Sequence, residues 1–309
     1  MDFSLSPEQQ QIRDEVRKLC LQFDDAYWLE KDRSGEFPHE LHAALAAAGW
    51  LGIAMPEAYG GAGLGITEAA IMMQAVAESG AAMTGASAVH INIFGLQPVV
   101  VFGTDEQKRR MLPPLIAGKD KACFAVTEPD AGLDTTAIKV RAERRGEHYV
   151  LSGQKIWIST AQVANKILIL ARTTPLESVK RRTEGLSLFY TDLDRTRAAV
   201  RVIDKMGRHA VDSNMVFVDG MVVPAAHRIG AEGDGFRSIL HGMNPERILI
   251  AAEAVGIGRA ALRKTAQYAK EYHVERYLRE SLIPRIAPIS PHMILNFIAE
   301  KVLGLPKSY

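Results

Sequence analysis

The chain has 309 residues, of which 47% are hydrophobic and 24% are charged, and its formal net charge is +1. This length supports two or three compact units, and the near-zero charge gives no electrostatic case for nucleic acid or an anionic membrane as a partner. Two cysteines, Cys20 and Cys123, are too few for a disulfide framework, so a reducing cytoplasm fits best.

No targeting or membrane-spanning segment is expected. The opening MDFSLSPEQQ has neither the basic nor the apolar region of a signal peptide. The longest apolar segment, 43–55, is shorter than a membrane span and contains glycines.

The N-terminal part, 1–120, is predicted to be a helical domain. Ser6 and Gln9 form a capping box, with Pro7 in the first helical position. Apolar residues then recur at helical spacing and predict one buried stripe: Ile12, Val16, Leu19 and Phe23. Three further helices are predicted: 38–49, 66–80, and one that follows the capping box of Thr104 and Gln107 and ends around Pro113 and Pro114.

The middle part, 121–235, is predicted to be a mainly β domain. Strands are expected at 124–127, 139–159, 166–173, 185–193 and 214–223. Turn signals within the second of these occur at Arg145-Gly146 and at Ser152-Gly153.

The remaining part, 236–309, returns to helix, so the fold class is α+β. Asn244 is a good N-cap and Pro245 suits a first helical position, which predicts a long helix from 244 to about 271. A final helix is expected from about 290 to 303, ending at Gly304. In this setting Glu246 is either an ordinary first-turn acid that favours the helix dipole or a catalytic base.

Common catalytic signatures are absent from the sequence. It contains no HExxH zinc motif, no GxSxG nucleophile turn and no GxGxxG after a strand. The segment CFAVTEPDAGLDTT, 123–136, runs from a strand into a turn whose backbone N–H groups can approach an anion or a planar ring. In QKIWISTA, 154–161, the usual fate of the tryptophan on such a strand is burial in the core.

Taken together and in order, several segments resemble the acyl-CoA dehydrogenase family. They are FSLSPEQQQIRDEVRKL, MPEAYGGAGLG, FGTDEQKRRMLPPLIAGK, VTEPDAGLD, SGQKIWIS, KMGRHAVDSNMVFVDGMVVP, AEGDGF and the Glu-Arg pair of the long helix. The resemblance covers nearly the whole chain. It implies FAD between the β domain and the C-terminal helices, an acyl-CoA thioester against the flavin, α-proton removal by a carboxylate and hydride transfer to flavin N5, giving the trans-2-enoyl-CoA.

The resemblance also implies roles for residues of the β domain. Thr127 matches a threonine that hydrogen-bonds the flavin, and Trp157 matches a tryptophan packed beside its ring. Leu133 stands where the family often has a serine that contacts the flavin or the pantetheine arm, so it can offer only its backbone. The implied cofactor-binding residues are Phe124, Ala125, Val126, Thr127, Trp157, Ile158 and Ser159.

The family places its base in one of two positions. In IAPIS, 286–290, Pro288 occupies the first of these, and proline cannot accept a proton. The Glu246-Arg247 pair matches the second position, so the resemblance favours Glu246 as the base, with Asn244 and Arg247 in the substrate-contacting segment. A helix N-terminus and a neighbouring arginine lower a carboxylate pKa, whereas such a base benefits from a raised pKa.

The C-terminal helical domain is shorter than the family's. The helices that follow the Glu-Arg helix in the family have no counterpart here, and the join falls within QYAKEYHVE, 267–275. We therefore expect an exposed apolar stripe on the long helix and a reduced adenine and pyrophosphate side of the FAD site.

Three functions follow as alternatives. The first is an FAD-dependent acyl-CoA dehydrogenase, which an electron-transferring flavoprotein reoxidises and which is homo-oligomeric in the family. The second is an oxygen-using flavoenzyme of the same fold, because fold alone does not fix chemistry. The third is a non-catalytic deletion remnant that at most binds acyl-CoA or a partner.

Overall fold

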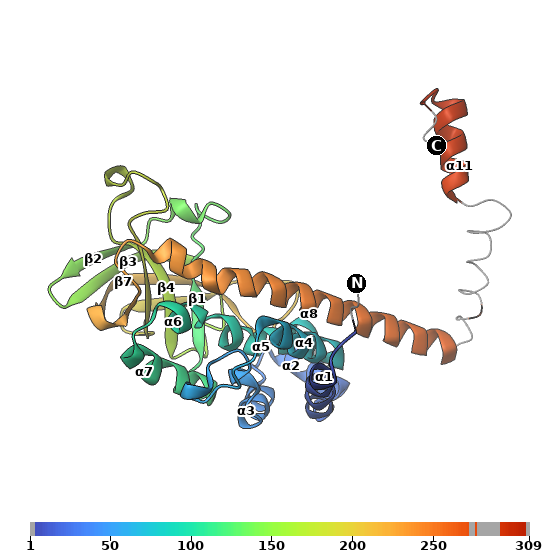
Figure 1. Ribbon diagram of the computed structural model, residues 1–309, viewed down its shortest axis with the longest axis horizontal. Coiled ribbons are helices and arrows are strands. Elements are labelled where there is room, and N and C mark those ends of the chain that lie inside the picture. Colours follow the sequence, from blue (N-terminus) through green and yellow to red (C-terminus); the bar gives the residue numbers. More distant parts are fainter. Residues whose placement is uncertain (1–3, 272–275, 277–290, 307–309) are drawn as a thin grey trace. The chain divides into compact units, whose positions relative to one another are not determined.

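The computed structural model describes residues 4–271, 276 and 291–306, and the chain divides into two units, 1–258 and 259–309. Within the first unit, helices come first along the chain, a β-sheet follows and the long helix α8 begins after it (Figure 1). The expected α+β class is therefore confirmed.

The helical part begins as its capping signals predict. The Ser6 hydroxyl accepts from the backbone N–H of Gln9, and Thr104 does the same for Gln107, so both predicted capping boxes are present. Helices α2, α5 and α6 were not predicted from the sequence. The helices are α1 (Pro7–Cys20), α2 (Asp25–Ser34), α3 (His39–Ala47), α4 (Ile66–Val76), α5 (Ala82–Phe94), α6 (Gln97–Phe102) and α7 (Asp105–Ile116).

The core of this part is built from the stripe on α1 and from the apolar helices α4 to α6. Ile12, Val16 and Phe23 are buried as predicted, and Leu19 is partly buried against the same cluster. The segment Ile66–Phe102 is long and apolar enough to span a membrane, but 78% of its most apolar window is buried inside the protein. Core helices give the same pattern.

The sheet has eight strands in the order β6-β7-β3-β2-β4-β5-β8, and β1 pairs in parallel with β4. The predicted Arg145-Gly146 turn joins β2 to β3. Strands β6 and β8 were not predicted. The strands are β1 (Ala122–Ala125), β2 (Arg141–Arg145), β3 (His148–Ser159), β4 (Lys166–Arg172), β5 (Leu186–Asp192), β6 (Ala198–Val202), β7 (Ser213–Pro224) and β8 (Arg228–Ile229).

The predicted turn at Ser152-Gly153 is wrong, because β3 continues through it with a bulge against β7. Gly153 has φ +143°, and a Cβ there would lie 2.7 Å from Cγ2 of Val140. A glycine inside a strand thus marks a bulge and a close approach rather than a strand end.

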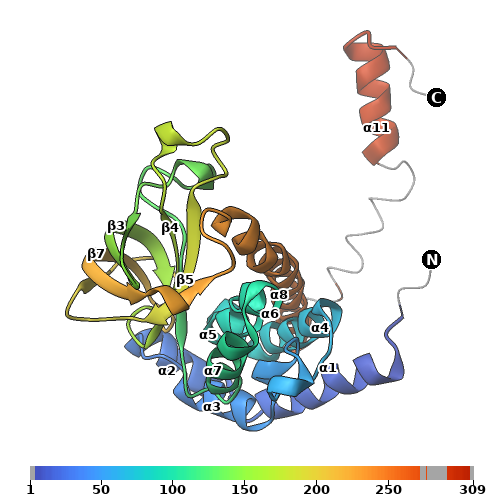
Figure 2. The ribbon, with the colours of Figure 1, turned by 60° about the vertical axis from the view of Figure 1, so that its left-hand side comes forward.

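The long helix α8 spans Gly235–Glu271, so its predicted start at Asn244 is wrong, whereas its predicted end is met. Pro245 lies inside the helix. Over its residues in the first unit, α8 lies along α4 and α5 (Figures 1 and 2). At Gly256 the approach is so close that a Cβ would lie 2.5 Å from the backbone oxygen of Gln74.

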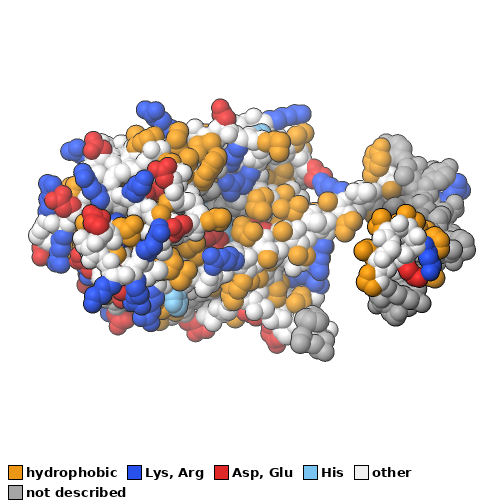
Figure 3. Space-filling view, turned by 90° about the horizontal axis from the view of Figure 1, so that it is seen from above, with side chains coloured by type: hydrophobic (Ala, Val, Ile, Leu, Met, Phe, Trp, Pro, Cys, Tyr) orange, Lys and Arg blue, Asp and Glu red, His pale blue; other side chains and the backbone are white. Residues whose placement is uncertain are grey.

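One face of α8 carries exposed apolar side chains, as expected from the shortened C-terminal domain. Ile248 and Val255, which lie two turns apart on this face, are 46% and 50% exposed. In the space-filling view from above, hydrophobic side chains gather on this side of the molecule (Figure 3). Apolar side chains left exposed on one face of a helix favour association.

In the second unit, the helix predicted for 290–303 is present as α11 (Pro291–Phe297), continued by the π-helical turn Ile298–Val302. Gly304 follows with φ +65°, which suits its predicted role as a helix terminator. The segment 286–290 and part of the join at 267–275 lie outside the described residues.

Candidate functional site

A cavity of about 130 Å³ lies in the first unit, where the sheet meets α5 and α8. It gathers a carboxylate, an imidazole, a guanidinium and three hydroxyl groups among aromatic and aliphatic side chains. The residues that line it are Ser87, His90, Ile91 and Phe94 of α5; Phe124 of β1; Trp157 and Ser159 of β3; Thr160; Arg208; and Glu246 and Ile250 of α8.

The two predicted cofactor-binding segments lie side by side. The backbone oxygen of Thr127 accepts from the N–H of Ile156 at 2.9 Å. Phe124 is partly buried on the cavity wall, Ala125 and Val126 are buried behind it, and Thr127 is partly exposed. Segments that are about 30 positions apart in the sequence thus form one surface.

Trp157 is not a core residue, so the interpretation from strand statistics is wrong. It lies in a second irregularity of β3, between Lys155 and Ile158, with φ +62°, and it is 59% exposed. The irregularity reverses the alternation of the strand, so Ile158 is buried while Trp157 and Ser159 face the cavity. A non-glycine residue at positive φ is strained, and such strain often accompanies functional sites.

A buried ion pair ties the two segments together. Nζ of Lys155 lies 3.0 Å from Oε1 of Glu128, and their side chains are 0% and 5% exposed. Glu128 also accepts from the backbone N–H groups of Lys139 and Val140. Burial lowers the pKa of Lys155 to about 8. This pair contributes a rigid frame behind the cavity rather than a reacting group.

Glu246 lies on the cavity wall in the interior of α8, eleven positions after the helix begins. Burial raises its pKa above the ordinary carboxyl value. His90 and Arg247 oppose this shift, and Glu253 adds to it. The balance favours a carboxylate that takes up a proton more readily than a free glutamate does.

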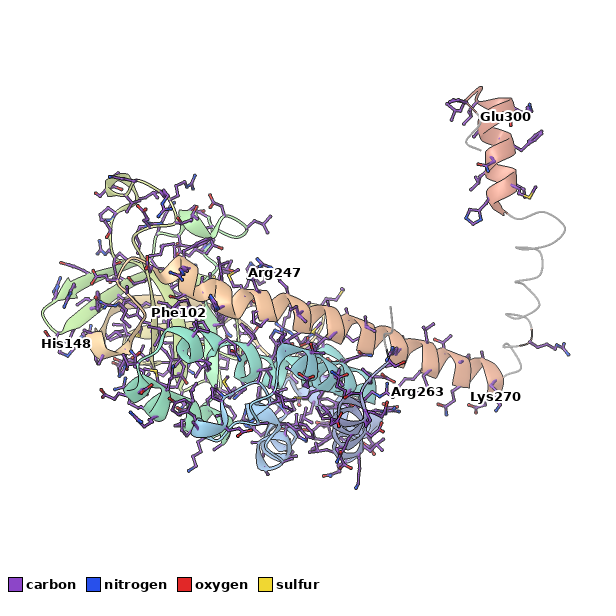
Figure 4. The ribbon with its side chains drawn as sticks, in the orientation of Figure 1. Phe102, His148, Arg247, Arg263, Lys270 and Glu300 are labelled. Atoms are coloured by element: carbon purple, nitrogen blue, oxygen red, sulfur yellow. The ribbon has the colours of Figure 1, made fainter. Side chains whose placement is uncertain are left out.

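The residues predicted to contact the substrate, Asn244, Arg247 and Leu133, lie outside the lining of the cavity. Nη1 of Arg247 donates to Oδ1 of Asn244 at 2.5 Å, and both side chains are exposed. Arg247 extends from α8 toward solvent (Figure 4). Leu133 is fully exposed on the loop after β1. None of the three lines the cavity.

Arg208 is a cavity residue that sequence reasoning missed. Its guanidinium donates to the hydroxyls of Ser87, Ser159 and Ser213, each at 3.0 Å, and its backbone has φ +58°. Ser159, predicted to contact the cofactor, therefore also holds Arg208. The segment KMGRHAVDSN contributed to the resemblance but was given no role.

His90 and Glu253 were also missed. Nδ1 of His90 lies 2.6 Å from Oε1 of Glu253, and the Glu253 side chain is fully buried. His90 stands alone in an apolar stretch, where a histidine is ordinarily a satisfied core residue. The available signal was the spacing from Glu246 to Glu253, because seven positions are two helical turns and put both on one face.

Three sequence models match the chain in order. They are described as acyl-CoA dehydrogenase, N-terminal domain, over residues 6–119; middle domain, over 123–221; and C-terminal domain, over 233–283.

Individual proteins match as well. The chain is 33% identical to "Probable acyl-CoA dehydrogenase YngJ" of Bacillus subtilis, over 88% of this chain and 70% of that protein. It is 29% identical to "Acyl-CoA dehydrogenase FadE12" of Mycobacterium tuberculosis over 391 residues, which cover 99% of each chain. That alignment is longer than the chain itself, so the positions without a counterpart lie inside it. Among solved structures, the FAD complex of PigA matches with a TM-score of 0.80 and 27% identity, over 87% of this chain and 70% of that one.

Proposed function

The chain belongs to the acyl-CoA dehydrogenase family, and from that premise we propose that it catalyses FAD-dependent α,β-dehydrogenation of an acyl-CoA thioester, with Glu246 as the base. One observation carries the proposal. Glu246, whose pKa is raised by burial, shares a cavity with Phe124, Trp157 and Ser159 of the β domain. A base for a weakly acidic C–H group needs this combination of position and proton affinity.

The residues on the β side of the cavity fit a planar flavin ring. Trp157 offers an exposed aromatic face, and Phe124 and the hydroxyl of Ser159 lie on the same wall. In the proposal, the flavin ring is held by the two segments of the β domain, Phe124, Ala125, Val126, Thr127, Trp157, Ile158 and Ser159. When bound there, FAD supplies the acceptor for the hydride that leaves the β-carbon.

The chain's own residues carry the proton chemistry. Glu246 takes the α-proton onto a carboxylate oxygen, which breaks the Cα–H bond and forms an O–H bond. Apolar neighbours such as Ile91 and Ile250 limit the access of water to this proton. In the proposal, the acyl-CoA is contacted by Asn244, Arg247 and the backbone of Leu133.

The wider setting is part of the same proposal. An electron-transferring flavoprotein is the proposed acceptor, and the proposed assembly is a homo-oligomer. The proposed location is the cytoplasm, because Cys20 and Cys123 are both buried free thiols. The proposed domain limits remain 1–120, 121–235 and 236–309.

The test is anaerobic bleaching of the flavin absorbance of the FAD-loaded protein by a panel of acyl-CoA thioesters. We expect one thioester to bleach the band, and Glu246→Gln to slow bleaching by at least about 100-fold because the general base is lost. Glu15→Gln, at an exposed position on α1, is the matched control and should bleach at the original rate. Equal rates for Glu246→Gln and Glu15→Gln would remove Glu246 from the mechanism.

The same experiment separates the alternatives. Rapid reoxidation of the bleached flavin in air indicates an oxygen-using flavoenzyme. A folded protein that retains no FAD indicates a non-catalytic remnant, which the exposed apolar face of α8 favours.

A further inference from the structure

A second acid–base pair lies directly beside the proposed base. His90 on α5 and Glu253 on α8 are joined by a hydrogen bond of 2.6 Å between Nδ1 and Oε1. The histidine is 9% exposed and the glutamate is fully buried. Within the described part of the chain, Nε2 of His90 and Oε2 of Glu253 are buried and have no hydrogen-bond partner. Buried polar atoms of this kind are rare and call for an explanation.

The bond to Glu253 fixes the orientation of the imidazole. With Glu253 as a carboxylate, which only accepts, Nδ1 is the donor of this bond, and Nε2 is the ring nitrogen left without a partner. The ring of His90 also packs edge-on against Phe94, at 4.7 Å between centroids, and the ring of Phe94 in turn lies 5.2 Å from that of Phe124. The imidazole is therefore held in one position on the cavity wall.

The charged groups around the cavity place this pair next to Glu246. Glu246 and Glu253 lie two turns apart on one face of α8, and His90 packs against that face from α5. Arg208 reaches the same cavity from the segment between β6 and β7, and Arg247 adds a positive charge from α8 itself. Protonation of His90 thus changes a charge close to Glu246, in a cavity where His90 is buried and Glu246 is half-buried.

We propose that His90, held by Glu253, is a positioning residue that sets the protonation state of Glu246. For its catalytic consequence this proposal rests on the proposed dehydrogenation, but the coupling between the two groups does not. The sign is fixed by charge: an imidazolium beside Glu246 favours its carboxylate, and the Glu246 carboxylate favours the imidazolium. His90 thus opposes the effect of burial and of Glu253, both of which raise the pKa of Glu246 and favour its neutral form.

The first test follows the titration of the His90 imidazole by NMR in the flavin-free protein. Linkage is reciprocal, so the isosteric Glu246→Gln must move the midpoint of His90 to lower pH, by about 0.5 to 1 unit. His148, at the far end of the sheet (Figure 4), is the internal control, and its signal should titrate identically in both proteins. An unmoved His90 midpoint overturns the proposal, whatever the activity of the protein.

The second test compares the pH profile of kcat/KM in the FAD-loaded His90→Gln variant with that of the unsubstituted protein. We expect the acidic limb to move up by about one unit, which is a loss of about tenfold below the limb with recovery above it. Glu253→Gln removes the anchor of His90 but also removes a carboxylate that raises the pKa of Glu246, so it should move the limb by less than His90→Gln does. A loss by one factor at every pH indicates a purely structural role and overturns the proposal.

The two proposals fail separately. If the His90 midpoint responds to Glu246→Gln but the protein oxidises no acyl-CoA, the proposed dehydrogenase function is wrong and the proposed coupling stands. If the protein is an active dehydrogenase but Glu246→Gln does not change the His90 midpoint, only the proposed coupling is wrong.

Discussion

The contact that places Glu246 and Glu253 on the cavity is tested by two glycines on α8. Gly256 is buried, and a Cβ there would lie 2.5 Å from the Gln74 backbone oxygen and 3.0 Å from Cβ of Ala77. Gly258 is exposed, and a Cβ there meets nothing within 4 Å. Gly256→Ala and Gly258→Ala therefore make the same chemical change in the same helix, one inside the contact and one outside it.

The expected effects have opposite signs. Replacing glycine by alanine in a helix interior stabilises by about 1 kcal/mol, and this term is common to both variants. At Gly256 the added methyl must displace backbone atoms of α4 and the following turn, an overpacking cost of about 1–3 kcal/mol. The free energy of unfolding should therefore be lower for Gly256→Ala than for Gly258→Ala by about 1–3 kcal/mol, because the propensity term cancels.

Equilibrium urea unfolding, followed by tryptophan fluorescence, measures this difference. The three tryptophans, Trp28, Trp50 and Trp157, all lie in the first unit, so the signal reports on the unit that contains the contact. The urea midpoint should fall for Gly256→Ala and stay or rise for Gly258→Ala, at equal slopes. Equal midpoints for the two variants would show that α8 does not pack against α4 at Gly256.

Two further predictions concern buried charge. Burial lowers the pKa of His42 to about 4, and Lys121 adds a smaller effect in the same direction. Between pH 6.5 and 4 the unfolded chain therefore binds more protons than the folded protein does. The free energy of unfolding should fall by up to about 3 kcal/mol as the pH falls across this range. His42→Gln should abolish that fall in urea melts taken at several pH values. Lys155→Met leaves the Glu128 carboxylate buried without its cation and should cost about 3–5 kcal/mol. Lys139→Met, at an exposed pair with Asp130, should cost less than about 1 kcal/mol in the same melts.

The elements that the sequence predicted are those whose signals are local. A serine or threonine three positions before a glutamine satisfies the first N–H groups of a helix without help from the rest of the fold, and both such boxes are present. The strands from 139 to 223 carry alternation or apolar runs between turn signals, and most are found. In each case the deciding interaction lies within a few positions of the residues that signal it.

The errors occur where tertiary packing outweighs a local signal. Asn244 and Pro245 look like a helix start, yet α8 has already run for nine residues. The preceding turns pack against the core through Ile239, which is fully buried, and through Phe236. That packing offsets the hydrogen bond that Pro245 cannot donate. Instead of capping, Asn244 accepts a hydrogen bond from Arg247.

The site was predicted as separate segments, and the groups that join them were not predicted. Motif residues such as Thr127 and Trp157 occur in contiguous, recognisable runs. His90, Arg208 and Glu253 are single residues in unrelated parts of the chain, and only the folded packing of α5, α8 and the β6–β7 connection brings them together. The sequence alone does not show that these three side chains lie around one cavity.

The corrected helix start also changes the chemistry expected of Glu246. In a first turn, the N–H groups of the helix would favour the carboxylate and oppose a base of raised pKa. The dipole effect fades within the first turn, and Glu246 lies eleven positions inside α8. Burial is then the largest influence and raises the pKa, while His90 and Arg247 limit the shift. The error about where the helix begins had therefore supplied one of the two electrostatic arguments against Glu246 as the base. The other, the neighbouring Arg247, remains, and burial outweighs it.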